Sequence, residues 1–435
     1  MTETSESGAQ RSTCRSHLVT AKGITPLPDK VSAIVNFPQP VAEGNMEEIF
    51  ACIAYEPCLL DYSEFKKVKE PVWVLGREYN IQDNDDDLVK LNEDIKSRLW
   101  FTYRKQFQPI GGSSLTSDSG WGCMHRCGQM ILGQALILHH FGRDWKWKPS
   151  NSNEVYKKIL SKFDDKFECP YSIHRIAMMG HVMDKEIGHW FGPNTIIQVL
   201  KKLVEDDPDN DIILYVAMDN MVIQSEIRKL FRRRSTGSYS GESQGAENSG
   251  SQCNTEDHCN ELGSNEKESP VLLTIPLRLG LSEILPIYFE KLKEVFKLKQ
   301  FLGMIGGRTN HASYFIGFVG NELVYLDPHT TQVHKSNEMD DMTFHCDNPS
   351  RMKFSDLDPS IALCFYFEND VDFLQWCEIV KRDILEPEKD AMFELMDKRI
   401  VMLPYVDSDE EEDSNTPLNN NDRIYTSDDE FELLM

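Results

Sequence analysis

The chain has 435 residues, of which 40% are hydrophobic and 27% charged, and its formal net charge is −25 at pH 7. This length can bury one large core or two smaller ones, and the negative charge argues against a nucleic-acid partner. The 11 scattered cysteines, the start without a basic or apolar leader, and the lack of any bilayer-length apolar run predict a reduced, soluble, cytoplasmic protein with free thiols.

Composition divides the chain into three segments. Residues 1–45 are polar with scattered prolines and predict a flexible arm. Residues 46–400 carry the aromatic and apolar runs of a globular domain, interrupted by a Ser-, Gly-, Glu- and Asn-rich stretch at 233–269 that predicts a disordered insertion. Residues 401–435 predict a disordered acidic tail. The insertion contains three potential metal ligands that we interpret as loop residues: Cys253, His258 and Cys259.

The most informative stretch is Gly120-Trp121-Gly122-Cys123, which precedes a long apolar run. Helical spacing in that run places Cys123 at the first residue or so of a buried helix. The positive end of the helix dipole would lower the pKa of Cys123 and favour its nucleophilic thiolate. Asp118 and Ser119 lie where a helix cap is expected. The residues that recur at helical spacing after Cys123 are Cys127, Met130, Ile131, Gln134, Ala135 and Leu138.

Two other interpretations of Cys123 are open at this point. A cysteine at a helix start is more often a small buried hydrophobe than a nucleophile. A zinc site with His125 and Cys127 is disfavoured, because His125 would point away from the face that the two cysteines share. No second Cys/His pair at ligand spacing accompanies them.

The elements after this helix become rich in strands. A helix is predicted to open at Pro193, with Ile196, Val199, Leu200 and Leu203 on one face. Gly320-Asn321 joins two apolar aromatic runs and predicts a β-hairpin. Helices first and strands later favour an α+β fold. The remaining expected elements are strands at 212–218, 271–277 and 361–367 and helices at 284–298 and 370–385.

The second strand of the predicted hairpin runs directly into Asp327-Pro328-His329. In extended structure the side chains of Asp327 and His329 emerge on one face, and Pro328 stiffens the link between them. The carboxylate can hold one ring nitrogen of His329 and leave the other for a cysteine. Asp-x-His alone is a weak pattern. Together with a helix-starting cysteine it predicts a papain-type cysteine protease, although here the orienting residue precedes the histidine instead of following it.

Four motifs resemble those of the autophagins, the autophagy cysteine endopeptidases. They lie at 116–124, 190–195, 325–332 and 344–346, and the resemblance covers about 71–395 without the insertion. It implies a papain-like fold with a small extra subdomain. We expect no metal and no cofactor. It also implies that the enzyme trims the precursor of a GABARAP-type ubiquitin-like modifier to expose a C-terminal glycine. The same enzyme would release that modifier from phosphatidylethanolamine during a transient encounter with membranes.

By motif position, the resemblance makes Cys123 the nucleophile, His329 the base and Asp327 the orienting group. Tyr103 would form the oxyanion hole with the backbone N–H of Cys123. Trp190 would gate a narrow channel for the glycine tail. A second gate would come from the loop that contains Gly306, Gly307 and Asn310. Family members commonly have Lys-Pro where this chain has Arg308-Thr309.

Two further sites are hypotheses. In the tail, Phe431 and Leu434 follow Asp428-Asp429-Glu430 and resemble the short acidic motif that docks on such modifiers. A weaker copy lies at Phe50, where packing against the domain is the preferred interpretation. Cys127, one helical turn from Cys123, is a candidate partner in reversible oxidation, with a plain core role as the alternative.

Two other classes of protein compete with this interpretation. A binding module or catalytically dead scaffold would hold the modifier without cleaving it. The intact set of Cys123, Asp327 and His329 argues against that class. A deubiquitinase-like hydrolase would share the same chemistry and differ only in its substrate pocket.

Overall fold

The computed structural model describes the chain at residues 12–14, 17–20, 23–26, 69–82, 85–149, 153–232, 268–308, 310–335, 340–385 and 390–399. The predicted tail at 401–435, most of the arm at 1–45 and nearly all of the insertion at 233–269 lie outside the described residues. The elements below belong to the first of two compact units, Met1–Asp397.

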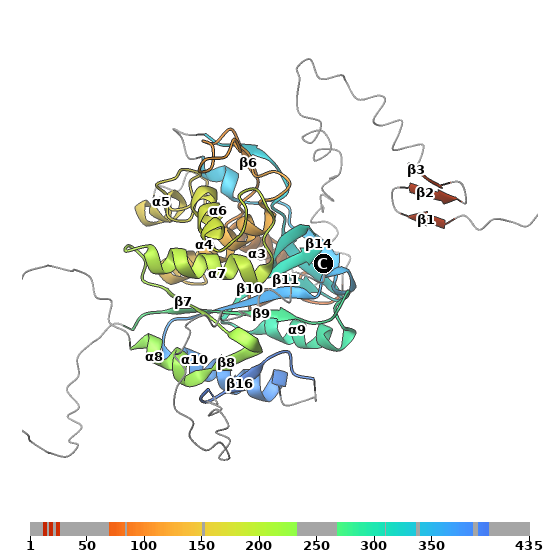
Figure 1. Ribbon diagram of the computed structural model, residues 1–435. Helices are drawn as coiled ribbons and strands as arrows, with labels where there is room; N and C mark the ends of the chain where they lie inside the picture. Colours follow the sequence, from red (N-terminus) through yellow and green to blue (C-terminus); the bar gives the residue numbers. More distant parts are fainter. Residues whose placement is uncertain are drawn as a thin grey trace, which may run out of the picture. The chain divides into compact units, whose positions relative to one another are not determined.

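Within the described part of the chain, nine strands form one sheet, whose pairs are antiparallel except for the parallel pair β7–β9 (Figure 1). Its main path runs β14 (Ser350–Lys353), β12 (Glu322–Leu326), β11 (His311–Val319), β10 (Phe301–Arg308), β15 (Ser360–Phe367), β9 (Val271–Arg278) and β7 (Ile213–Val216). Two further strands, β4 (Val72–Val74) and β5 (Arg77–Tyr79), form a hairpin that pairs with the second half of β11.

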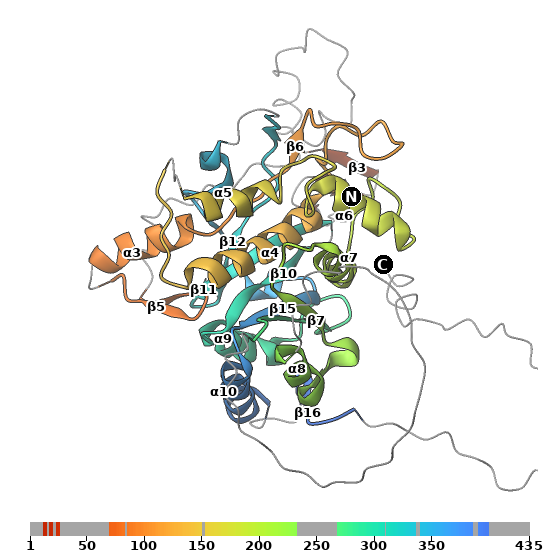
Figure 2. The same cartoon turned by 90° about the vertical axis from the view of Figure 1, so that its left-hand side faces the viewer.

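Helices pack on both faces of this sheet (Figures 1 and 2). On one face lie α4 (Cys123–Phe141) and α7 (Pro193–Asp206), with α5 (Glu154–Ser161) against α4 and α6 (Ile173–Val182) against both. On the other face lie α8 (Gln224–Phe231), α9 (Phe289–Lys297) and α10 (Asp370–Val380). Helix α3 (Asp85–Lys96) contacts β4 and β5.

The shorter elements complete the described part of the chain. Three small sheets join β1 (Ser12–Cys14), β2 (His17–Thr20) and β3 (Gly23–Pro26); β6 (Arg104–Lys105) and β13 (Gln332–Val333); and β8 (Met221–Ile223) and β16 (Glu394–Met396). The 3₁₀ turns are η2 (Met218–Asn220), η3 (Pro286–Tyr288), η4 (Asp341–Phe344) and η5 (Phe354–Asp356), and η6 (Lys381–Leu385) is a π-helical turn. None of the described helices combines the length and the apolar character that crossing a membrane requires.

The expectation of an α+β fold is confirmed, because the helices surround a mixed sheet. Helix α4 is buried on nearly all sides, as expected for a helix held between a sheet and other helices, and 15 of its 19 residues are buried. The predicted hairpin is the pair β11 and β12, with Gly320 in the left-handed region at φ 54°.

Two predicted helix boundaries differ from the structure. The helix expected from residue 284 begins only at Phe289, because Pro286 opens the 3₁₀ turn η3 instead. The helix expected to continue to residue 385 changes at Lys381 from α10 into the π-helical turn η6. Its inward side chains are still those that the spacing indicated: Phe373, Trp376, Val380 and Ile384 are buried.

Candidate active site

Cys123 is the first residue of α4 and is fully buried, as predicted. Gly122 precedes it at the N-cap position, without a side-chain cap. A Cβ atom on Gly122 would overlap the Asp118 carboxylate, so only glycine fits here. The expectation that Asp118 caps the helix with its side chain is wrong. The carboxylate instead accepts hydrogen bonds of 2.7 Å from the Arg104 backbone N–H and from Arg126 Nε.

A buried ion cluster holds the first turn of α4 in place. Arg126, three residues after Cys123, donates from Nε to Asp118 and from its two terminal nitrogens to Asp165, at 3.0 and 2.9 Å. It also donates to the side-chain oxygen of Gln129 at 3.0 Å. These side chains are at most 3% exposed. Because Asp118 and Asp165 lie on opposite sides of Cys123 in the sequence, Arg126 ties the helix start to both segments.

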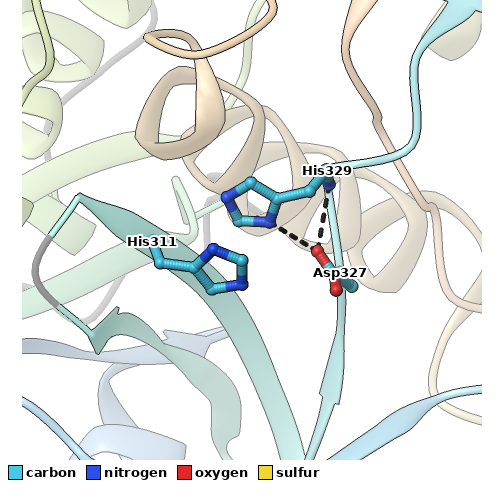
Figure 3. A group of neighbouring side chains, drawn as sticks. All are labelled: His311, Asp327 and His329. Carbon is cyan, nitrogen blue, oxygen red and sulfur yellow. Dashed lines mark hydrogen bonds and ion pairs between the residues drawn. The ribbon is translucent and has the colours of Figure 1, made fainter. Parts of the chain in front are cut away.

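Asp327 and His329 follow directly after β12, as predicted (Figure 3). His329 Nδ1 lies 2.6 Å from Asp327 Oδ1, and the backbone N–H of His329 donates to the same oxygen at 3.0 Å. Trp100 Nε1 donates to the backbone oxygen of Asp327 at 2.6 Å, so the backbone of Asp327 is held in place as well as its carboxylate. With Nδ1 engaged by the carboxylate, Nε2 is the nitrogen left to face a nucleophile.

Cys123 at the start of α4 and His329 at the end of β12 interact, since each shifts the pKa of the other. Burial alone would raise the pKa of Cys123, but the hydrogen bond and positive charge of His329 lower it below its usual value. The backbone N–H of Ala312 and the Tyr103 hydroxyl lower it further. Burial works against the charge on His329, but Asp327 and Cys123 outweigh it and raise the pKa of His329 to about 9. Both shifts favour the thiolate–imidazolium form of the pair over the neutral form.

Tyr103 lies beside both members of this pair. Its backbone N–H donates to Pro328 O and its carbonyl accepts from the N–H of Gln332, each at 2.9 Å. Its ring meets the His329 ring edge-on, with centroids 5.4 Å apart. Burial and the charge of Cys123 raise the pKa of Tyr103, so the phenol keeps its proton and can act as a donor beside the sulfur.

The residues expected to gate the site lie on two segments. Trp190 is half-buried just before α7, and its indole N–H is buried without an acceptor among the described residues. Gly306 and Gly307 lie near the end of β10, where a Cβ on Gly307 would overlap the backbone oxygen of His311. Asn310 occupies the left-handed region at φ 57°, in the turn that leads into β11.

Two residues near Cys123 behave as core residues. Cys127 is fully buried, and burial together with the charge of Cys123 raises its pKa well above the usual value. It is thus an unreactive thiol, which favours the core interpretation over a redox partner. His125 packs against Trp121 and Phe191, and burial lowers its pKa to about 3. Its ring contacts apolar side chains rather than the face of Cys123.

His311 is the site residue that sequence reasoning missed. Its ring lies parallel to that of His329, with centroids 3.6 Å apart and planes inclined by 1° (Figure 3). His311, Asp327 and His329 bring one potential metal ligand each within 4.8 Å of one another. The lone pairs of imidazole nitrogens lie in the ring plane, so two parallel stacked rings cannot both aim at one ion. This arrangement therefore does not fit a metal ion without rotation of a ring.

The ion pair predicts an unusual pH dependence for alkylation of Cys123 by iodoacetamide. Because His329 keeps its proton up to about pH 9, the thiolate is expected to react well below the usual pKa of a cysteine. In His329→Ala, burial becomes the dominant influence on the pKa of Cys123 and raises it. Alkylation of Cys123 should therefore become fast only at alkaline pH. Peptide mass spectrometry at a series of pH values measures the rate at Cys123 alone. Equal midpoints in the two proteins would contradict the ion pair.

Comparison with known proteins agrees with this geometry. The catalytic-domain profile of the peptidase C54 family matches residues 88–379. The chain is 44% identical to Cysteine protease ATG4A of Gallus gallus over 389 residues, covering 86% of this chain and 99% of that protein. It is 45% identical to Cysteine protease ATG4B of Xenopus laevis over 380 residues, covering 86% and 96%. For Cysteine protease ATG4A of Homo sapiens the identity is 45% over 350 residues, covering 78% and 85%. The chain therefore belongs to the peptidase C54 family, the autophagins, and is a papain-like cysteine peptidase of autophagy.

Proposed function

We propose that this peptidase cleaves the C-terminus of a GABARAP-type ubiquitin-like modifier precursor to expose a glycine, and releases the same modifier from phosphatidylethanolamine. The observation that carries the proposal is the Cys123–His329–Asp327 arrangement at the start of α4. The motifs that resemble the autophagins supply the substrate class. A cytoplasmic location belongs to the proposal, and it is supported by the free thiols of all cysteines whose side chains the structure describes.

The proposed reaction begins with attack of the Cys123 thiolate on the carbonyl carbon of the substrate glycine. The Tyr103 hydroxyl and the backbone N–H of Cys123 donate to the oxyanion that forms. The His329 imidazolium gives its proton to the departing nitrogen, which is a peptide amine in the precursor and the ethanolamine amine in the lipid conjugate. Neutral His329 then takes a proton from water, which attacks the thioester and releases the modifier with a free glycine carboxylate. Asp327 holds the ring orientation throughout.

Access to the nucleophile requires an opening, because Cys123 is fully buried. In this proposal Trp190 and the turn with Gly306, Gly307 and Asn310 gate a channel wide enough for a glycine tail. The unpartnered indole N–H of Trp190 supports a role as a donor to passing substrate backbone. Without the proline that relatives commonly carry, the backbone of the turn is less restricted.

Incubation with a C-terminally extended modifier and with a matched ubiquitin fusion tests the proposal. Intact-mass analysis is expected to show cleavage after the modifier glycine and an uncut ubiquitin fusion. Cleavage of the ubiquitin fusion at a similar rate would instead favour the deubiquitinase-like hydrolase. Binding of the extended modifier without any cleavage would favour the scaffold.

The acidic tail is proposed as a second attachment point, through Phe431 and Leu434. Both residues lie outside the described part of the chain, so this proposal rests on the sequence pattern. Removal of residues after Asp422 in the Cys123→Ala background is expected to weaken affinity for the modifier. In the active protein it should slow release from vesicles more than trimming of soluble precursor, because membrane-held substrate rewards a second contact.

Point variants separate docking from charge in this test. Phe431→Ala with Leu434→Ala should reproduce the truncation, whereas Leu418→Ala in the same tail should not. Isothermal titration gives the affinities and a vesicle assay gives the release rates. Equal dissociation constants and equal release rates from vesicles for full-length and truncated protein would show that the tail has no role in docking.

A further inference from the structure

The first residues of β11 contact both members of the Cys123–His329 pair. The backbone N–H of Ala312 acts on the Cys123 sulfur and lowers the pKa of that thiol. The ring of the preceding residue, His311, covers a face of the His329 ring at a centroid distance of 3.6 Å. Figure 3 shows the two rings reaching toward each other from different strands, His311 from β11 and His329 from the end of β12. One dipeptide thus borders the nucleophile and the base together.

Asp327 fixes His329 within its ring plane, through the 2.6 Å bond to Nδ1. A bond in the ring plane does not by itself prevent water from approaching the ring face. A flat side chain parallel to that face does so, and it also opposes tilting of the ring. Hydrogen bonds shielded from water are electrostatically stronger than exposed ones. The stacked ring of His311 therefore protects the bond that sets the tautomer and the direction of Nε2.

From this geometry we propose that His311 is a positioning residue, a neutral aromatic cover that holds the His329 ring in line with Cys123 and keeps water from the Asp327–His329 bond. The proposal rests on the role of His329 as base in the proposed function. His311 transfers no proton in this account. Its action depends on a flat ring at this place and not on its nitrogens.

Burial and the charges around His311 keep it neutral. Burial, the charge of His329 and the charge of Arg308 lower the pKa of His311 to about 3. The ionisable groups that face the partner ring are Asp327 after β12, Cys123 on α4 and Tyr103 before β6. Two imidazolium rings stacked at this distance would repel each other, so a neutral His311 suits the protonated His329.

Three substitutions at His311 test the proposal. His311→Phe keeps a flat ring without a titratable nitrogen, and its kcat for precursor cleavage should stay within about twofold of wild type. His311→Ala removes the ring, and its kcat should fall roughly 2- to 10-fold with little change in KM, since aromatic pairs contribute this much beyond burial. His311→Ser repeats the comparison with a small polar side chain, which suits a half-buried position if the alanine variant unfolds. The exposed His181→Ala on α6 is the control.

Two readouts are independent of the substrate. The low-field proton NMR signal of His329 Nδ1–H should persist in His311→Phe and exchange faster with water in His311→Ala. The pH at which Cys123 begins to react with iodoacetamide should rise in His311→Ala and stay unchanged in His311→Phe. These readouts test His311 even if wild-type protein fails to cut the modifier, a failure that would overturn the proposed function instead.

An alanine variant with unchanged kcat, NMR exchange and alkylation profile would overturn the proposal. So would a phenylalanine variant as impaired as alanine, because that result assigns the role to the nitrogens. Thermal unfolding midpoints close to wild type show that the losses are local.

Discussion

Alanine in place of Cys123 is expected to abolish cleavage of the modifier precursor while leaving modifier binding intact. Covalent chemistry ends when the sulfur is removed, because Cys123 is the one described thiol that shifts the pKa of His329. The loss should be on the order of 10⁴-fold or more. Cys169→Ala, at a half-buried cysteine outside the site, is the matched control and should keep wild-type activity.

The losses in the triad should also be strongly non-additive. His329→Ala removes the proton donor and the charge that lowers the pKa of Cys123, so it should cost nearly as much as Cys123→Ala. Adding His329→Ala or Asp327→Ala to Cys123→Ala should then change the residual rate little. Single-turnover experiments with excess enzyme measure the residual cleavage rate of each variant. Independent losses that multiply in the double variants would show that the three side chains do not act as a unit.

Removal of the positive charge of Arg126 is expected to lower the free energy of unfolding more than any other substitution proposed here. Arg126→Met keeps the apolar stem but leaves Asp118 and Asp165 buried without their partner. Breaking a buried ion pair in this way typically costs about 3–5 kcal/mol. Because Arg126 holds the first turn of α4, the variant should also lose activity before it unfolds. Urea denaturation followed by tryptophan fluorescence gives the free energy of unfolding.

Lys157→Met is the matched control for this effect. Lys157 pairs with Glu154 on the surface of α5 at 3.1 Å, and both side chains are more than half exposed. Exposed pairs contribute about 0–1 kcal/mol, so this variant should differ little from wild type. If Arg126→Met were no less stable than Lys157→Met, the buried cluster would have no special structural role.

The places of Cys123, Asp327 and His329 in the fold could be predicted from the sequence because each carries a local signal. Apolar residues at helical spacing follow Cys123. Asp327 and His329 follow a strand that is predicted from the hairpin turn at Gly320-Asn321. These patterns extend over a few residues, where propensity and periodicity act directly. The α+β class follows from the same local patterns, since it needs only the kinds and order of the elements.

The supporting residues lacked such a signal because their partners are distant in the chain. Asp118 was expected to cap α4, but it meets Arg126 and the backbone of Arg104 instead. Asp165, which completes that cluster, lies 39 positions from Arg126. His311 acquires its role only when β11 and the end of β12 are side by side. A charged residue at an inward position of an apolar helix, such as Arg126, was the one available hint.

The most direct test of the account is covalent capture with a GABARAP-type modifier that carries an electrophile in place of its C-terminal carboxylate. Wild-type protein is incubated with this probe, and the modified cysteine is located by peptide mass spectrometry. The account predicts one adduct, a thioether at Cys123. It also predicts far slower capture in His329→Ala and no capture by the corresponding ubiquitin probe. An adduct at another cysteine, or equal capture without His329, would contradict it.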